Sequence, residues 1–185
     1  MVYITHLVLQ GSITQEVWVA ILWIIVLLTM IVSVGRSFLQ EQDRSYYYYF
    51  LTTPNLILSG KIVYATIFGM FLTLLCFLNM LFFFPSLIEF SFLFFLNLFL
   101  GSLGLGVSFT MVSGLSAHSS HQSGMVTVLG LPLSIPTFLV AVYNSKMIVS
   151  GAGYDDIKEM MITLVSIDIV IIAILYLLFP FIWKK

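Results

Sequence analysis

Residues 35–61 read GRSFLQEQDRSYYYYFLTTPNLILSGK and stand between long apolar stretches. The charged side chains of this segment are Arg36, Glu41, Asp43, Arg44 and Lys61. As a helix, the segment places most of its polar groups on one face and most of its aromatic groups on another. This pattern predicts an amphipathic helix in the membrane interface, where the tyrosine run at 46–49 suits headgroup depth. Pro54 is expected to end that helix, and a second helix is expected from about Leu56.

The composition around this segment is that of an integral membrane protein. The chain has 185 residues, of which 61% are hydrophobic and 8% are charged, and its mean hydropathy is +1.12. Soluble domains carry roughly a quarter charged residues. A transmembrane barrel would show short alternating segments instead of long apolar runs. The sequence therefore predicts an all-α polytopic transmembrane bundle. The net charge of −1 and the lack of a basic patch speak against a nucleic-acid partner.

One transmembrane domain is expected over residues 1–185, with a coupling segment at 35–61. A spanning helix needs about 20 apolar residues. Five full spans are predicted at about 17–34, 62–84, 90–113, 125–142 and 160–179. Residues 1–10 are apolar but too short to span, and we interpret them as the remnant of a sixth, first span.

The distribution of basic residues predicts the orientation. Five spans put the two termini on opposite sides of the membrane. A cytoplasmic C-terminus gives five basic residues inside and two outside, which satisfies the positive-inside rule. The inner residues are Arg36, Arg44, Lys61, Lys184 and Lys185, and the outer ones are Lys146 and Lys158. Segment 35–61 is then cytoplasmic.

Small residues in the third span predict close helix packing. The run GSLGLGVS at 101–108 repeats small residues at i, i+4, which lets helix backbones approach closely in lipid. It superficially resembles a phosphate-binding loop, but no strand precedes it and no lysine follows it. The candidate packing residues are Gly101, Gly104 and Gly106. In the fourth span, Pro132 and Pro136 predict a kink or partial unwinding.

Asp168 lies inside the fifth predicted span. A charge at this depth costs at least about 2.5 kcal/mol, so the side chain should face the bundle or be protonated. Asn97 lies at a similar depth in the third span and Asn79 is not far away, which suggests a polar cluster. The alternative is a neutral carboxyl bonded to a nearby serine or backbone carbonyl.

Catalytic and metal-binding motifs are not found in the sequence. It has no Walker A, HExxH, CxxC or nucleophile-elbow motif, so we expect no enzyme activity. The single cysteine, Cys76, excludes an internal disulfide. His118 and His121 are spaced i, i+3, but no cysteine or carboxylate lies beside them, so a polar loop is favoured over a metal or haem site.

Several short stretches resemble a known transporter family. The Leu-Thr-Thr-Pro turn at 51–54, between an interfacial helix and a span that follows Lys61, resembles permeases of the ABC-2 type. The run VLGLPLSIP at 128–136 resembles the haem exporter protein B (CcmB) family. Residues 37–54, 110–117 and 176–183 are similar to its bacteroidete-like branch. The resemblance extends from Gly11 onward, but the chain lacks the family's full first span and has tyrosines in place of a Gly-Thr-Leu-Glu motif.

This resemblance implies a permease subunit in a bacterial inner membrane. Its partners would be a separate ABC ATPase, other cytochrome c maturation membrane proteins and a haem chaperone. ATP would be hydrolysed in the partner, and haem would be a handled species, with no cofactor bound directly by this chain. The implied ATPase-coupling residues are Arg36, Glu41, Asp43, Arg44 and Pro54. The alternatives are an ABC-2 permease for a lipid or drug, a non-transporting scaffold of the haem-handling complex, and an intramembrane enzyme, for which only Asp168 is available.

Overall fold

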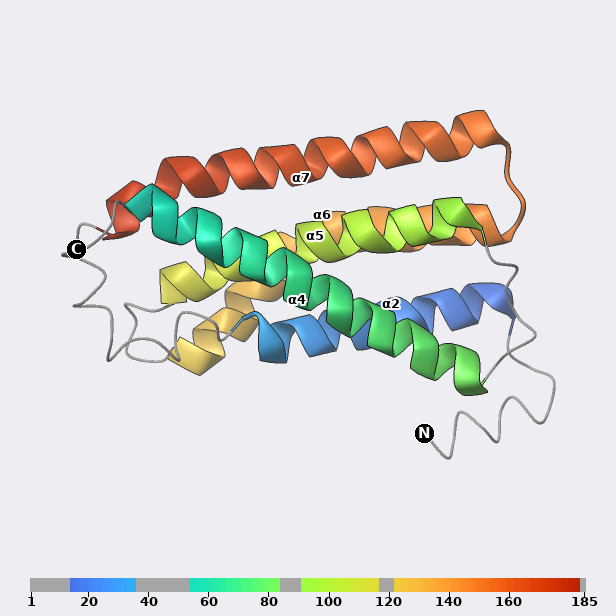
Figure 1. Cartoon of the computed structure of the whole chain (residues 1–185), viewed down its shortest axis with the longest axis horizontal. Helices are drawn as coiled ribbons and strands as arrows, with labels where there is room; N and C mark the ends of the chain where they lie inside the picture. Colours follow the sequence, from blue (N-terminus) through green and yellow to red (C-terminus); the bar gives the residue numbers. More distant parts are fainter. Residues whose placement is uncertain (1–13, 36–53, 84–90, 117–121, 184–185) are drawn as a thin grey trace.

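Five long helices make up the structure (Figure 1). The computed structural model describes residues 14–35, 54–83, 91–116 and 122–183. The helices are α2 (Gln15–Ser33), α4 (Pro54–Phe83), α5 (Phe92–Ser116), α6 (Gln122–Val149) and α7 (Tyr154–Trp183). Each is long and apolar enough to cross a membrane, and the described ranges contain no strand. The predicted all-α polytopic bundle is therefore confirmed.

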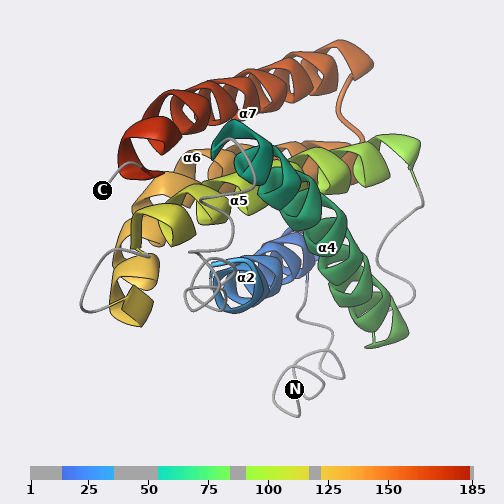
Figure 2. The same ribbon diagram turned by 60° about the vertical axis from the view of Figure 1, so that its left-hand side comes forward.

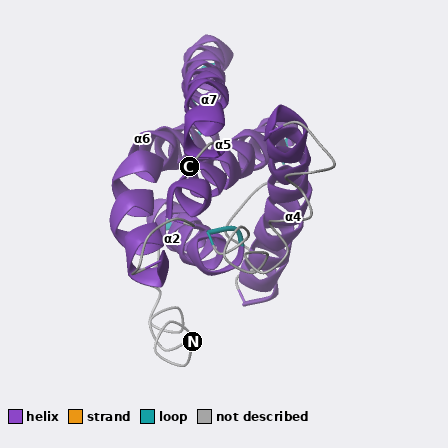
Figure 3. Cartoon of the chain, turned by 90° about the vertical axis from the view of Figure 1, so that its left-hand side faces the viewer, coloured by secondary structure: helices purple, strands orange, loops and turns teal. Residues whose placement is uncertain are grey.

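Helix α5 is the central element of the bundle. It packs against α2, α4, α6 and α7, and Figures 2 and 3 show the other helices arranged around it. In its most apolar stretch 61% of the residues are buried, compared with 22–33% in the other four helices. The apolar side chains left exposed on the outer helices face lipid, since a chain this apolar covers its surface with the bilayer.

The helix ends gather at two opposite ends of the molecule. Helices α4 and α6 begin, and α2, α5 and α7 end, on the left of Figure 1. Segments 36–53 and 117–121 therefore join helix ends on that side, whereas 84–90 and 150–153 join them on the other. This alternation is the arrangement expected of antiparallel spans.

Two helices are longer than the sequence predicted. The predicted spans at 125–142 and 160–179 leave residues 143–159 between them as a polar connection, but α6 runs to Val149 and α7 begins at Tyr154. Gly151 has φ +74°. The amide of Ala152 donates to Met147 O at 3.0 Å, and the amide of Gly151 donates to Ile148 O at 3.3 Å. These two bonds form a Schellman motif, so a four-residue turn is enough to reverse the chain.

Helix α4 is one continuous element that starts at the proline. Pro54 is its first residue, a position where the missing amide hydrogen costs nothing. The 30 residues of α4 reach about 45 Å, more than the roughly 30 Å hydrocarbon thickness. The helix therefore tilts or projects into the interface, and its first turns lie at the end where segment 36–53 enters.

Candidate functional site in the bundle interior

Three glycines of α5 face three different sets of neighbours. A Cβ atom on Gly101 would overlap the ring of Trp23 in α2 and would lie 3.0 Å from Ala141 Cβ in α6. A Cβ atom on Gly106 would lie 3.2 Å from Ala65 O in α4. Gly104 faces α6 and α7. The absence of side chains at these positions lets four helices approach α5 closely.

Asn97 is the centre of a buried hydrogen-bond network. Its amide nitrogen donates to Ser145 Oγ at 2.7 Å and to Ala141 O at 2.9 Å. Asn144 Nδ2 donates to Asn97 Oδ1 at 2.9 Å. Trp23 Nε1 donates to Ser145 Oγ at 2.8 Å. The network joins α2, α5 and α6, and all of these side chains are fully buried.

Asp168 lies in a second polar centre, between α5, α6 and α7. The side chain is 4% exposed. A Cβ atom on Gly104 would overlap a carboxyl oxygen of Asp168 and would lie 2.6 Å from Thr137 Cγ2. Among the residues described, neither carboxyl oxygen of Asp168 has a hydrogen-bond partner, and the same is true of the Thr137 hydroxyl. Asp168 therefore faces the bundle and not the lipid.

Among the residues that the structure describes, no hydrogen bond links Asp168 with Asn97, so the single polar cluster expected from the sequence divides into two centres. Gly104, against which Asp168 packs, is seven residues or about 10 Å along α5 from Asn97. Asn79 belongs to neither centre, because its side chain is exposed and bonds to Leu75 O of its own helix. The alternative expected from the sequence was a hydrogen bond from the Asp168 carboxyl to a serine or a backbone carbonyl. Among the described residues, no such bond is formed.

Helix α6 contains both predicted kink residues. Pro132 and Pro136 lie inside a continuous α-helix, so the expected partial unwinding is not observed. Figures 1 and 2 both show α6 changing direction along its length. Proline removes one backbone hydrogen bond and its ring pushes against the preceding turn, which bends a helix without ending it.

Most of the predicted coupling residues lie outside the described ranges, as do the two histidines of the predicted polar loop. Those residues are Arg36, Glu41, Asp43, Arg44, His118 and His121. Pro54 is described and begins α4. Within the ranges that the structure covers, no group of three His, Cys, Asp or Glu side chains is placed to hold a metal ion.

The first turns of α4 contact α7 near its end, and this contact was not predicted from the sequence. Ser59 Oγ and Tyr176 Oη lie 2.8 Å apart in a hydrogen bond. Leu58 is fully buried in a cluster with Val107 of α5 and Leu175 of α7. A displacement of the first turns of α4 would therefore be felt by both α5 and α7.

One comparison with known proteins gives a match. The family model described as "CcmB protein" matches residues 9–182. No curated protein and no solved structure matches the chain. The matched range contains α2, α4, α5 and α6 in full and α7 up to residue 182. It also contains both polar centres and the segment 36–53.

Proposed function

Because the chain belongs to the CcmB family, we propose that it is the permease subunit of an ABC transporter in c-type cytochrome biogenesis. Family membership makes it a membrane subunit of the haem exporter. In our proposal, a separate ABC ATPase docks on segment 35–61 and its ATP hydrolysis drives release of a haem-loaded chaperone on the opposite side of a bacterial inner membrane. The match over residues 9–182 is the observation that carries this proposal.

The contacts of α4 support a route for coupling. Segment 36–53 leads directly into α4 at Pro54. Four residues later, Leu58 packs in the cluster shared with α5 and α7. Farther along, Ala65 meets the backbone of α5 at Gly106. A displacement of the segment before Pro54 would be transmitted to α5 and α7 through one continuous helix. The bend in α6 would allow the bundle to adjust to that displacement.

Reversing the acidic pair of the coupling segment tests the docking. We expect Glu41→Lys with Asp43→Lys to abolish co-purification of the ATPase, because like charges replace the acidic contact. The matched control is Asp155→Lys with Asp156→Lys, which makes the same charge change at the other end of the molecule and should leave co-purification intact. If the ATPase remains bound to the Glu41/Asp43 variant, docking on this segment is wrong.

Haem staining of c-type cytochromes tests the function. Deletion of the protein should abolish the stained cytochromes, and expression of the chain should restore them. An ATPase-dead partner should give the same loss as the deletion if ATP hydrolysis drives this subunit. A scaffold that only assembles the haem-handling complex predicts different phenotypes for the two strains.

A further inference from the structure

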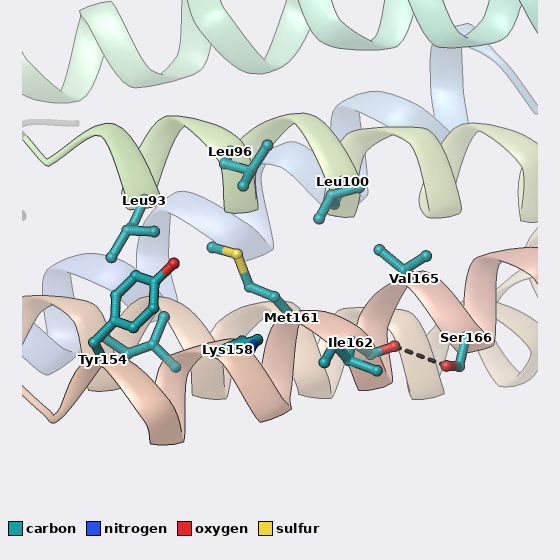
Figure 4. A pocket seen from close by; sticks show the side chains of 10 residues that line it. Leu93, Leu96, Leu100, Tyr154, Lys158, Met161, Ile162, Val165 and Ser166 are labelled. Atoms are coloured by element: carbon teal, nitrogen blue, oxygen red, sulfur yellow. Dashed lines mark hydrogen bonds between the residues drawn. The ribbon is translucent and has the colours of Figure 1, made fainter.

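A groove of about 440 Å³ lies between α5 and α7 (Figure 4). Figure 3 shows α7 on the opposite side of α5 from α2. On α5 it is lined by Leu93, Leu96 and Leu100. On α7 its apolar lining is Ile157, Met161, Ile162 and Val165. Met161 and Val165 point from α7 toward the three leucines, and Tyr154 and Lys158 lie toward the end where α7 begins (Figure 4). The volume is that of a small-ligand site.

The groove runs from the membrane interface toward the middle of the bilayer. From Tyr154 to Val165 the axis of α7 rises about 16 Å, whereas one leaflet with its headgroup region is about 20 Å thick, half of the roughly 40–45 Å bilayer. Beyond Val165 the two helices meet where Asp168 packs against Gly104, which closes the groove near the middle of the membrane. Its walls are also partly open to the side, since Leu96 and Ile162 are 36% and 56% exposed. An extended acyl chain of a single leaflet fits this shape.

The interfacial end of the groove carries charges of both signs. Lys158 lines the groove, is exposed, and has no ion-pair partner in the described part of the chain. Tyr154, at the first residue of α7, brings a phenol to the same end. Asp155, Asp156 and Glu159 occupy the neighbouring positions and are exposed. A lysine on a long stem readily extends to headgroup level, and a tyrosine there is at its preferred depth.

We propose that this groove binds one phospholipid with an amine-bearing zwitterionic headgroup, of the phosphatidylethanolamine type. One acyl chain lies between α5 and α7. Lys158 and Tyr154 contact the phosphate, and the carboxylates of Asp155 and Glu159 contact the ammonium group. Three acidic residues beside one lysine disfavour a headgroup of net negative charge, and an ammonium with N–H donors satisfies carboxylates that a quaternary amine cannot hydrogen-bond.

Native mass spectrometry of the intact protein complex tests the proposal. The complex is reconstituted in nanodiscs that contain equal amounts of phosphatidylethanolamine, phosphatidylcholine and phosphatidylglycerol. After release, we expect one retained phosphatidylethanolamine for each copy of this chain. Lys158→Met should reduce that retention about tenfold, since it removes a charge-assisted contact to the phosphate.

Two matched controls accompany these variants. Lys146→Met removes a basic residue near the same end, but that lysine is paired with Glu16 at 3.6 Å, so lipid retention should not change. Leu96→Trp fills the groove and should displace the lipid, whereas Leu139→Trp places the same ring on an exposed position of α6 outside the groove and should not. Lys158 is exposed, so the Lys158→Met variant tests the headgroup contact without disturbing the core.

Three results would overturn the proposal. The first is unchanged phosphatidylethanolamine retention in both Lys158→Met and Leu96→Trp. The second is equal retention of all three lipids by the unaltered chain. The third is a protein occupant, detected as a cross-link from a photoreactive residue at position 162 to a helix of another chain in place of a lipid adduct.

Discussion

At Gly104, the backbone of α5 meets two side chains that belong to different helices. The carboxyl of Asp168 and the methyl of Thr137 occupy the space that a side chain at this position would need. We expect Gly104→Ala to lower the free energy of unfolding by about 1–3 kcal/mol, although alanine favours a helix over glycine by up to about 1 kcal/mol. Denaturation of the purified protein in mixed micelles measures the change.

Gly60 provides the matched control for this substitution. A Cβ atom on Gly60 meets no heavy atom within 4 Å, so Gly60→Ala should leave the free energy of unfolding unchanged or raise it by up to about 1 kcal/mol. Asp168→Ala frees space beside Gly104 and should make Gly104→Ala less costly, with a coupling of about 0.5–3 kcal/mol. Equal costs of Gly104→Ala in both backgrounds would contradict the packing described for this site.

Asn97 makes hydrogen bonds to two other buried side chains and one carbonyl. Asn97→Leu removes these bonds and leaves Asn144 Nδ2 without its acceptor. Hydrogen bonds between transmembrane helices contribute about 0.6 kcal/mol each and up to about 1.7 kcal/mol. We expect a total loss of about 1–3 kcal/mol in the same denaturation measurement.

Asn79 serves as the control for Asn97, because it is exposed and bonds only to Leu75 O of its own helix. Asn79→Leu should change the free energy of unfolding by less than about 0.5 kcal/mol. If Asn79→Leu costs as much as Asn97→Leu, the network does not hold α5 and α6 together.

The sequence indicated which residues of the interior are special, but not what they contact. Gly104, Asn97 and Asp168 stand out because small or polar residues are rare in an apolar span. Their partners Thr137 and Ser145 do not stand out, since a serine or threonine also satisfies its hydroxyl within its own helix. Partner identity depends on how each helix is rotated about its axis, and helices that are apolar on all sides carry little periodic signal for that rotation.

The five spans were predictable at the scale of the helix because about 20 consecutive apolar residues have few alternatives in a bilayer. The ends were less predictable. The predicted loop at 143–159 contains polar residues that extend helices α6 and α7 beyond the hydrocarbon layer. Hydropathy indicates where the hydrocarbon layer ends. The end of α6 and the start of α7 are instead set by the turn at Gly151, which reverses the chain.

The two prolines of α6 give a prediction about the helix as a unit. Pro136 cannot donate to the carbonyl of Pro132, and Pro132 cannot donate to the carbonyl of Val128. Replacing both prolines by alanine should restore these two bonds, straighten α6 and raise the unfolding temperature. If the bend serves transport, haem-stained c-type cytochromes should decrease at the same time.

Pro54→Ala is the control for the stability part of this prediction. Pro54 is the first residue of α4, where its missing amide hydrogen costs no helical bond. Replacing it should therefore change the free energy of unfolding by only about 0.2 kcal/mol, which corresponds to a change in unfolding temperature of about a degree or less. An α6 without prolines that unfolds at a lower temperature would show that the bend is needed for packing.

The orientation of the whole molecule can be tested with the chain's own cysteine content. Cys76 is the single cysteine, so Cys76→Ser gives a cysteine-free background. Ser150 and Asn55 are both exposed. Ser150 follows the last residue of α6 and Asn55 is the second residue of α4, and those two helix ends lie at opposite ends of the bundle (Figure 1). With the C-terminus in the cytoplasm, Ser150→Cys should react with a membrane-impermeant maleimide in intact cells, and Asn55→Cys should react only after permeabilisation. The reverse labelling pattern would invert the proposed orientation.

The central position of α5 has a consequence for how the protein is made. This helix leaves the ribosome after α2 and α4, but its Gly104 face packs against α6 and α7, which are synthesised later. Its most apolar stretch also has the lowest mean hydropathy of the five, 1.9 compared with 2.1–2.7. Until α7 is synthesised, the face of α5 that packs against α7 therefore has no protein partner, although α5 is the least apolar of the five spans. Completion of the bundle must await the synthesis of α7, which brings Asp168 into place.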